Sequence, residues 1–249
     1  MTKYTINKVF EKALASNIWK IEVDPMQPLI AVETRDMDST EATFQVFDLE
    51  GNCRMSPCQA DGKEWTLDSI QDGHLILKRV GEHTPIQEGI QIIDSSQNKT
   101  VFTSYEFILL DVFYRKVHAR HRSIASGETI AIDILTGQYS PSPENKFEIC
   151  PNKIQYPITY QTKPHFLASE EIEGPIWLSK CATHYLWCYH QANADGFSLI
   201  LALSDLNRLL DRQVILSQMG KMIPQPYFQM DRQLFFMTFD KREIVSYLV

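Results

Sequence analysis

The stretch Thr43-Phe44-Gln45-Val46-Phe47-Asp48, followed by Leu49-Glu50-Gly51-Asn52, decides the expected fold of this 249-residue chain. An apolar-rich run ends at an aspartate, and a turn sequence follows it. Such a run is typical of a β-strand. Asp followed by Gly or Asn is turn chemistry, because the carboxylate accepts backbone N–H groups and Gly or Asn tolerates a positive φ. The element recurs over residues 89–94, 129–133 and 199–205, where it ends at Asp94, Asp133 and Asp205.

A second element recurs six times and consists of an aromatic residue, a short polar turn and an apolar run. Its starting residues are Trp19, Trp65, Phe107, Phe147, Trp177 and Tyr227, at intervals of 46, 42, 40, 30 and 50 residues. Four-stranded propeller blades repeat every 40 to 50 residues or so. We therefore expect an all-β chain, a β-propeller of about six four-stranded blades that forms one domain over residues 1–249. Five to seven blades are compatible with the pattern.

The last unit, from Tyr227, has room for three strands before the chain ends. Residues 5–10 form an alternating run ahead of the first aromatic start. We expect this N-terminal strand to supply the missing strand and close the ring, because a closed ring leaves no free sheet edges.

Two segments fit the repeat less well. The fourth unit, residues 147–176, is short and contains Pro151, Pro157, Pro164 and Pro175, so its blade is expected to be irregular or reduced. Residues 206–219 carry apolar residues at helical spacing, but a turn and an outer strand over 213–216 match the other units better. A pair of β-sandwiches is the alternative fold.

Composition restricts the class of protein. The net charge of −7 argues against nucleic-acid binding, which needs a concentrated positive surface. Five cysteines without a CxxC pair predict neither a disulfide framework nor a zinc site, although Cys53 and Cys58 remain a possible pair. The N-terminus has no signal-peptide pattern, and no run of 18 apolar residues occurs, so we expect a cytoplasmic protein without a membrane partner.

Residues Ile130-Ala131-Ile132-Asp133-Ile134-Leu135-Thr136-Gly137 resemble the repeat of quinoprotein-type propellers. The resemblance implies the fold and no cofactor, because no residues match a quinone or calcium site. The whole length and the Glu88-Gly89-Ile90 entry are similar to a family of bacterial proteins, chiefly from Bacteroidetes, that is known as a domain of unknown function. This resemblance likewise implies a fold and no activity.

Candidate binding residues gather in the loops between second and third strands, which emerge on one face of a propeller. They are Arg35, Arg79, His83, His118, Arg120, His121 and His190. Arg and His side chains there predict a locally basic face that suits an anionic ligand. The alternative is that these loops are polar simply because they are solvated.

The sequence gives less support to more specific roles, such as metal binding or catalysis by particular residues. His118 and His121 have a spacing compatible with two metal ligands, but no third ligand is identifiable, so no metal is expected. Arg120 and Arg122 suit a phosphate or carboxylate. The recurring aspartates are expected to cap turns rather than catalyse, and Trp19, Trp65 and Trp177 to pack between blades. Cys181 and Cys188 are expected to be buried.

We therefore predict a non-catalytic binding or scaffold propeller with a protein or a small anion as its partner. The alternative is a metabolite sensor or hydrolase-like enzyme with its site at the channel mouth. The chain has no nucleophile elbow and no phosphate-binding glycine loop, which favours the first function.

Overall fold

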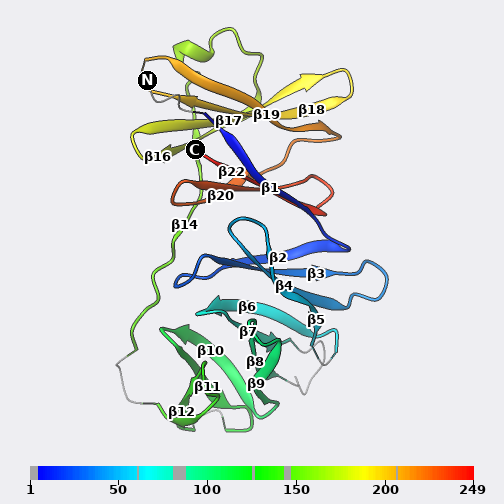
Figure 1. Cartoon of the computed structure of the whole chain (residues 1–249), viewed down its shortest axis with the longest axis vertical. Coiled ribbons are helices and arrows are strands. Elements are labelled where there is room, and N and C mark those ends of the chain that lie inside the picture. The colour runs from blue at the N-terminus through cyan, green and yellow to red at the C-terminus, as the bar shows by residue number, and fades with distance from the viewer. Residues whose placement is uncertain (1–4, 61, 81–87, 125–126, 143–146, 206) are drawn as a thin grey trace. The chain divides into compact units, whose positions relative to one another are not determined.

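The computed structural model describes residues 5–60, 62–80, 88–124, 127–142, 147–205 and 207–249. They form antiparallel β-strands in five sheets and one short 3-10 turn, His165–Leu167 (Figure 1). The all-β prediction is therefore confirmed. The chain divides into two compact units, residues 14–152 and residues 153–249 together with 1–13, which we call the N-terminal and C-terminal units. Within the described ranges no helix has the length and apolarity to span a bilayer.

The N-terminal unit contains three four-stranded sheets, each built from consecutive strands. Sheet I consists of β2 (Asn17–Val23), β3 (Leu29–Arg35), β4 (Ala42–Asp48) and β5 (Cys53–Gln59). Sheet II consists of β6 (Trp65–Gln71), β7 (His74–Arg79), β8 (Gly89–Asp94) and β9 (Lys99–Ser104). Sheet III consists of β10 (Phe107–Phe113), β11 (Lys116–His121), β12 (Thr129–Asp133) and β13 (Tyr139–Pro141). The predicted strand–turn–strand unit is thus repeated three times in succession.

The C-terminal unit contains two five-stranded sheets. Sheet IV consists of β15 (Ile158–Tyr160), β16 (Glu173–Cys181), β17 (His184–Asn193), β18 (Gly196–Ser204) and β19 (Leu209–Met219). Sheet V has the order β1 (Asn7–Ala13), β22 (Glu243–Leu248), β21 (Gln233–Met237), β20 (Tyr227–Met230) and β14 (Ile154–Gln155). The strand β19 confirms the choice of strand over helix for that segment.

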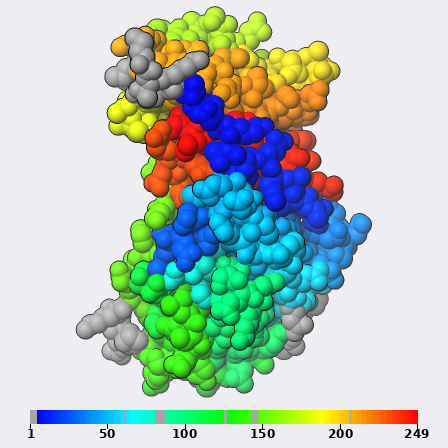
Figure 2. Space-filling view, viewed as in Figure 1, coloured from blue at the N-terminus to red at the C-terminus, as the bar shows by residue number. Residues whose placement is uncertain are grey.

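The N-terminal strand joins the last sheet, as expected. β1 pairs antiparallel with β22, from Asn7 opposite Leu248 to Ala13 opposite Glu243. Figure 2 shows the start of the chain (blue) against its C-terminal end (red). This pairing covers the outer edge of sheet V with a strand from the other end of the sequence.

The prediction of a separate fourth blade over residues 147–176 is wrong. Its two short strands extend other sheets: β14 pairs with β20, and β15 pairs with β16. Pro157 separates them, and a proline cannot donate to a ladder. The segment is therefore suited to two short edge strands, and the described residues form five sheets where about six were expected.

The first strand of every sheet in the N-terminal unit contains a β-bulge. The pairing skips one residue between Ile18 and Lys20, and again between Leu67 and Ser69, and between Leu109 and Asp111. The extra residues are therefore Trp19, Asp68 and Leu110. A bulge bends its strand and leaves backbone groups without ladder partners. The ammonium of Lys20 takes two such carbonyls in sheet II, Leu67 O at 2.9 Å and Asp68 O at 2.8 Å.

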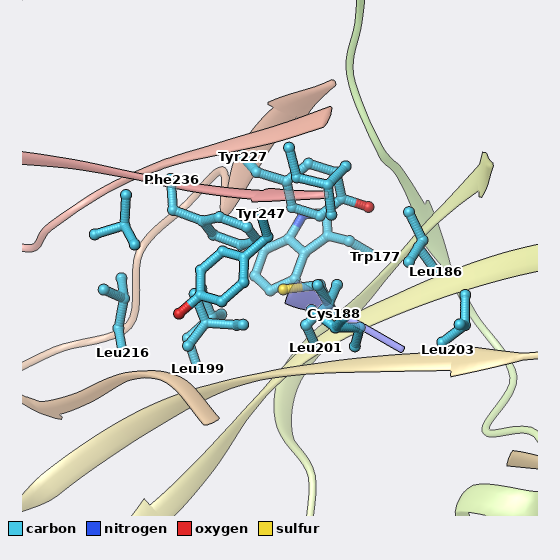
Figure 3. Packing of buried hydrophobic residues seen from close by; sticks show 14 of the residues in the cluster. Trp177, Leu186, Cys188, Leu199, Leu201, Leu203, Leu216, Tyr227, Phe236 and Tyr247 are labelled. Atoms are coloured by element: carbon cyan, nitrogen blue, oxygen red, sulfur yellow. The ribbon is translucent and has the colours of Figure 1, made fainter. Parts of the chain in front are cut away.

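Apolar cores form between neighbouring sheets of each unit. In the N-terminal unit, fully buried Trp65 belongs to a cluster that includes Phe44 of sheet I and Leu77 of sheet II. In the C-terminal unit, Trp177 packs with Tyr227 and Phe236 (Figure 3).

The expected packing roles divide in two. Trp65 and Trp177 are packed as predicted, and Cys181 and Cys188 are buried as predicted. The prediction is wrong for Trp19, which is 67% exposed. Trp19 is the extra residue of its bulge, so the strand turns it outward while the preceding residue, Ile18, is buried instead.

The recurring aspartates cap turns, as predicted. Asp48 accepts hydrogen bonds from the backbone N–H groups of Glu50 (3.1 Å) and Asn52 (2.8 Å). Asp94, Asp133 and Asp205 accept equivalent bonds from the residues two and three positions on. All four carboxyl groups have a pKa below the ordinary value of 3.8. Desolvation opposes this shift at each of them and is the largest single contribution at Asp48, Asp94 and Asp133, but the hydrogen bonds and neighbouring cations together outweigh it.

We predict that Asp48→Ala lowers the free energy of unfolding by about 2 kcal/mol, because charge-assisted bonds to two turn N–H groups are lost. Urea unfolding near neutral pH measures the change. Exposed Asp195, whose side chain makes no such pair of bonds to the described residues, supplies the control, and Asp195→Ala should change stability by less than about 0.5 kcal/mol. Because the pKa of Asp48 is lowered on folding, its contribution exists above pH 3.8 and disappears as the pH falls through the folded pKa. Equal destabilisation by both variants would contradict the capping role.

Candidate functional site

The structure places five of the seven predicted binding residues on second strands of the sheets in the N-terminal unit. They are Arg35 on β3, Arg79 on β7, and His118, Arg120 and His121 on β11. His190 lies on β17 of the C-terminal unit, and His83 is outside the described residues.

The bulges define which residues are equivalent in sheets I to III. The residue pair directly before each bulge is Ile18–Thr34, Leu67–Leu77 and Leu109–Ala119. The residue after the second member of each pair is the first equivalent position, which holds Arg35, Lys78 and Arg120 in sheets I, II and III. The residue before that member is the second equivalent position, which holds Glu33, Ile76 and His118. The first position therefore carries a cation in three successive sheets, while the second varies in character.

In sheet I the side chains at these two positions, Glu33 and Arg35, make polar contacts with sheet II, and we call this pair the lock. The Glu33 side chain is fully buried, and its Oε2 accepts hydrogen bonds from Thr66 Oγ1 (2.7 Å) and Leu67 N (2.8 Å). Its Oε1 pairs with Arg35 Nε at 2.7 Å. The Arg35 guanidinium then donates to Trp65 O at 2.8 Å and Lys63 O at 3.0 Å. Arg35 was expected to bind a ligand, and here its donors fasten two sheets together.

Arg35 also supports an exposed apolar patch. Its guanidinium lies 5.3 Å from the centre of the Trp19 ring, and Asn17, opposite Arg35 in the ladder, donates to the Met37 sulfur at 3.4 Å. Met37 is 70% exposed. We call Trp19, Arg35 and Met37 the Trp19 patch; it lies at the loop between the second and third strands of sheet I.

The loop beside the Trp19 patch is acidic, with Asp36, Asp38 and Glu41 all exposed. Hydrogen bonds from Ser39 and Asp38 to the Asp36 carboxylate hold its pKa below 3.8. The predicted basic face is therefore not uniform: in sheet I the cation is neutralised by Glu33, and carboxylates remain around it.

Between sheets II and III the equivalent space is a cavity of about 200 Å³. Its walls are Lys78, Arg79, Val80, Glu88, Gly89, Ile108 and Leu109. Lys78 bonds to Asp68 of its own sheet at 2.8 Å instead of crossing to sheet III. Arg79 lies 3.6 Å from Glu64 and 5.5 Å from the ring centre of Tyr105.

In sheet III the varying position holds His118, which lies among aromatic rings. Its ring centre is 4.9 Å from Phe147 and 6.1 Å from Phe113, and its Nε2 is buried with no hydrogen-bond partner among the described residues. His121 accepts a bond from Ser123 N at 3.3 Å. The described ranges contain no group of three or more His, Cys, Asp or Glu side chains placed to hold a metal ion.

His190 is separate from the other predicted residues, because it lies in the interior of the C-terminal unit. It is fully buried, and its Nε2 accepts a hydrogen bond from Ile223 N at 3.2 Å. Its ring meets Trp177 edge-on at 5.3 Å. Burial lowers the pKa of His190 below 6.5, so the residue fastens the chain between β19 and β20 as a neutral acceptor.

A second polar cluster, which no sequence pattern predicted, lies in the C-terminal unit. Arg212 donates to Glu170 (3.1 Å) and Gln191 (2.7 Å), and Gln191 donates to Glu170 (2.7 Å). The Tyr189 hydroxyl is buried beside them, and burial raises its pKa to about 12. These contacts attach the segment that contains Glu170 to sheet IV.

No family model and no curated protein matches the chain, so the resemblance to a bacterial family stays a prediction. Among solved structures it is similar to the β-propeller domain of the Trilobed protease from Pyrococcus furiosus, with 9% identity and a TM-score of 0.34 over 90% of this chain and 63% of that chain. It is also similar to Pyrococcus horikoshii acylaminoacyl peptidase (8%, TM-score 0.32, 88% and 35%) and to TolB from Acinetobacter baumannii (9%, TM-score 0.31, 94% and 55%). The chain thus spans less than two thirds of each of these three. Likenesses at this level carry no conclusion about activity, ligand or partner.

We predict that Glu33→Gln lowers the free energy of unfolding by about 2–4 kcal/mol, because Arg35 loses its buried counter-charge and three charge-assisted contacts weaken. Chemical denaturation measures the effect. Glu50→Gln, at an exposed position of the same sheet, should stay within about 0.5 kcal/mol of the parent protein. A Glu33→Gln protein as stable as the Glu50→Gln control would show that the lock is not needed.

For His190 we predict that the protein loses stability as the pH is lowered through 6.5. The unfolded chain then takes up a proton that the buried ring refuses, and the loss continues until the lower folded pKa is reached. His190→Gln should flatten this dependence, while His165→Gln, at an exposed position, should keep it. Thermal unfolding at a series of pH values distinguishes the two; equal pH dependence in all three proteins would disprove the assignment.

Proposed function

We propose that this chain is a non-catalytic binding protein whose sheets are blades of a β-propeller, and that its Trp19 patch docks a protein partner in the cytoplasm. The single observation that carries the proposal is the combination of an exposed Trp19, at 67%, and an exposed Met37, at 70%, around a fixed Arg35. Trp, Met and Arg are the residue types enriched where proteins bind one another, whereas a solvated loop surface rarely exposes them together.

Rigidity supports a binding role for the Trp19 patch. Arg35 is held by Glu33 and by the carbonyls of Trp65 and Lys63, so the Trp19 ring rests on a guanidinium that does not move freely. A side chain that is ordered before binding loses less conformational entropy on docking. The lock between sheets I and II therefore also prepares the surface.

Charge indicates what the partner carries. Asp36, Asp38 and Glu41 surround the patch, and the chain has a net charge of −7. Complementary charges raise association rates and exclude wrong partners. The partner is accordingly a protein segment with an apolar anchor flanked by Lys or Arg.

Groups that would serve nucleophilic catalysis have other tasks here. The recurring aspartates hold turns, and burial raises the pKa of Cys58 to about 11 and that of Cys188 well above 9.0, which keeps both thiols protonated. Cys53 and Cys58 are free thiols rather than the disulfide considered above, in keeping with a reducing compartment.

A displayed library of random 12-residue peptides, selected on the full chain, tests the proposal. We expect the enriched peptides to contain an apolar anchor flanked by Lys or Arg. Their affinity should fall by about tenfold or more on Trp19→Ala, the size of effect expected at an interface hot spot.

The control variant is Tyr139→Ala, which removes another exposed aromatic, 57% accessible, from sheet III. It should leave binding unchanged. The proposal fails if the enriched peptides bind Trp19→Ala as well as the parent protein, or if they are acidic.

A further inference from the structure

A further cavity, with a volume of about 380 Å³, lies in the C-terminal unit. Its walls come from β15 and the residues after it, and from the start of β16 with the residue Ile172 before it. Small-molecule sites in proteins have volumes of about 300 to 1,000 Å³, so a cavity of this size is large enough for a ligand.

Two interruptions of the ladders open this end of sheet IV. The pairing of β15 with β16 is short and ends with Tyr160 opposite Ile176. On the other side of β16, its pairing with β17 is irregular between Glu173 and Trp177. Pro175 lies within this stretch and has no N–H to donate to a ladder. The strands therefore separate here, and the residues at the separation line the cavity.

The cavity carries a positive charge. Lys163 is the one charged side chain among the described residues that line it. Its ammonium donates to Ala168 O at 3.0 Å and to Glu170 O, which orients the group without neutralising it. No described carboxylate forms an ion pair with Lys163, and that of Glu170 is bound to Arg212 and Gln191. Because an ammonium has three N–H groups, one donor and the full charge remain for a ligand.

The loop that carries Lys163 is anchored to sheet IV. Its 3-10 turn, His165–Leu167, places Leu167 in the apolar cluster that contains Trp187, where Leu167 is fully buried. With this anchor and the two carbonyl contacts, the ammonium is ordered before a ligand arrives, so binding loses less conformational entropy.

The remaining walls are largely apolar and include an aromatic ring. Tyr160 is 41% exposed, and its ring meets Trp187 edge-on at 5.2 Å. Ile172 and Ile176 pack in the same cluster as Trp187, and Pro175 adds an apolar ring. An aromatic ligand gains edge-to-face or offset contacts with a tyrosine ring in addition to the burial of its apolar surface.

We propose that this cavity binds a small aromatic carboxylate. Its carboxylate bonds to the Lys163 ammonium, and its ring packs against Tyr160 and Pro175. The volume equals that of about a dozen waters at about 30 Å³ each, which suits an acid with one ring or two fused rings. The site belongs to the C-terminal unit and is independent of the Trp19 patch, so Trp19→Ala should leave this binding unchanged.

Calorimetry and ligand-observed NMR with the full chain test the site, with phenylacetate as the probe. We expect saturable binding with a Kd of about 1 mM or below. Phenylacetamide has the same shape without the charge and should bind at least about tenfold more weakly, because the charge-assisted bond to Lys163 is lost. Cyclohexylacetate keeps the charge and lacks the aromatic ring, so it should bind about threefold more weakly.

Matched variants locate the site. Lys163→Gln should weaken phenylacetate binding by about tenfold or more, while Lys180→Gln, at an exposed position of β16, should not change it. Tyr160→Ala should weaken binding by about threefold or more, while Tyr156→Ala, which removes a ring that is 57% exposed, should not. Tyr160 lies on an edge strand, so its variant keeps the test decisive if Lys163→Gln folds poorly.

The proposal is overturned if phenylacetate does not bind, or if phenylacetamide or cyclohexylacetate binds as tightly as phenylacetate. It is also overturned if binding survives both Lys163→Gln and Tyr160→Ala, or if Lys180→Gln weakens binding as much as Lys163→Gln.

Discussion

The first strand of each sheet in the N-terminal unit holds one residue more than its partner strand can pair with, and much of the unit follows from this mismatch. The extra residue bends the strand and releases backbone groups from the ladder. Those groups are then available to the neighbouring sheet: Lys20 takes two carbonyls of sheet II, and Glu33 takes the N–H of Leu67. The contacts between sheets I and II are thus polar and specific as well as apolar.

One structural position decides what each interface does. Where it holds Glu33, a buried ion pair joins two sheets and holds Arg35 under Trp19. Where it holds Ile76, the sheets still pack through apolar contacts, but a cavity with an unmatched carboxylate remains. Where it holds His118, aromatic rings cover it. The same backbone position therefore gives an ion pair, a cavity or an aromatic contact, depending on whether its residue is Glu, Ile or His.

The sequence predicted the features that depend on neighbours along the chain. Asp48 and its counterparts cap turns because the donors lie two to four residues away, and the strand β1 joins β22 because the last unit lacked a strand. Predictions failed where one residue of register mattered. Trp19 matches Trp65 in spacing from its turn, yet a bulge turns it outward, and no residue pattern announces the bulge. Glu33 was missed because two of its partners, Thr66 and Leu67, are distant in sequence.

The contrast between Glu33 and Glu88 shows what a buried carboxylate requires. Burying a carboxylate is favourable only when donors repay its desolvation, and Glu33 has three close donor atoms, on Arg35, Thr66 and Leu67. Glu88 has one buried oxygen that no described donor reaches, in the equivalent interface. Folding alone would favour an apolar residue at such a place. The same repeat therefore places one buried carboxylate where three donors repay its desolvation and another where one oxygen has no donor among the described residues.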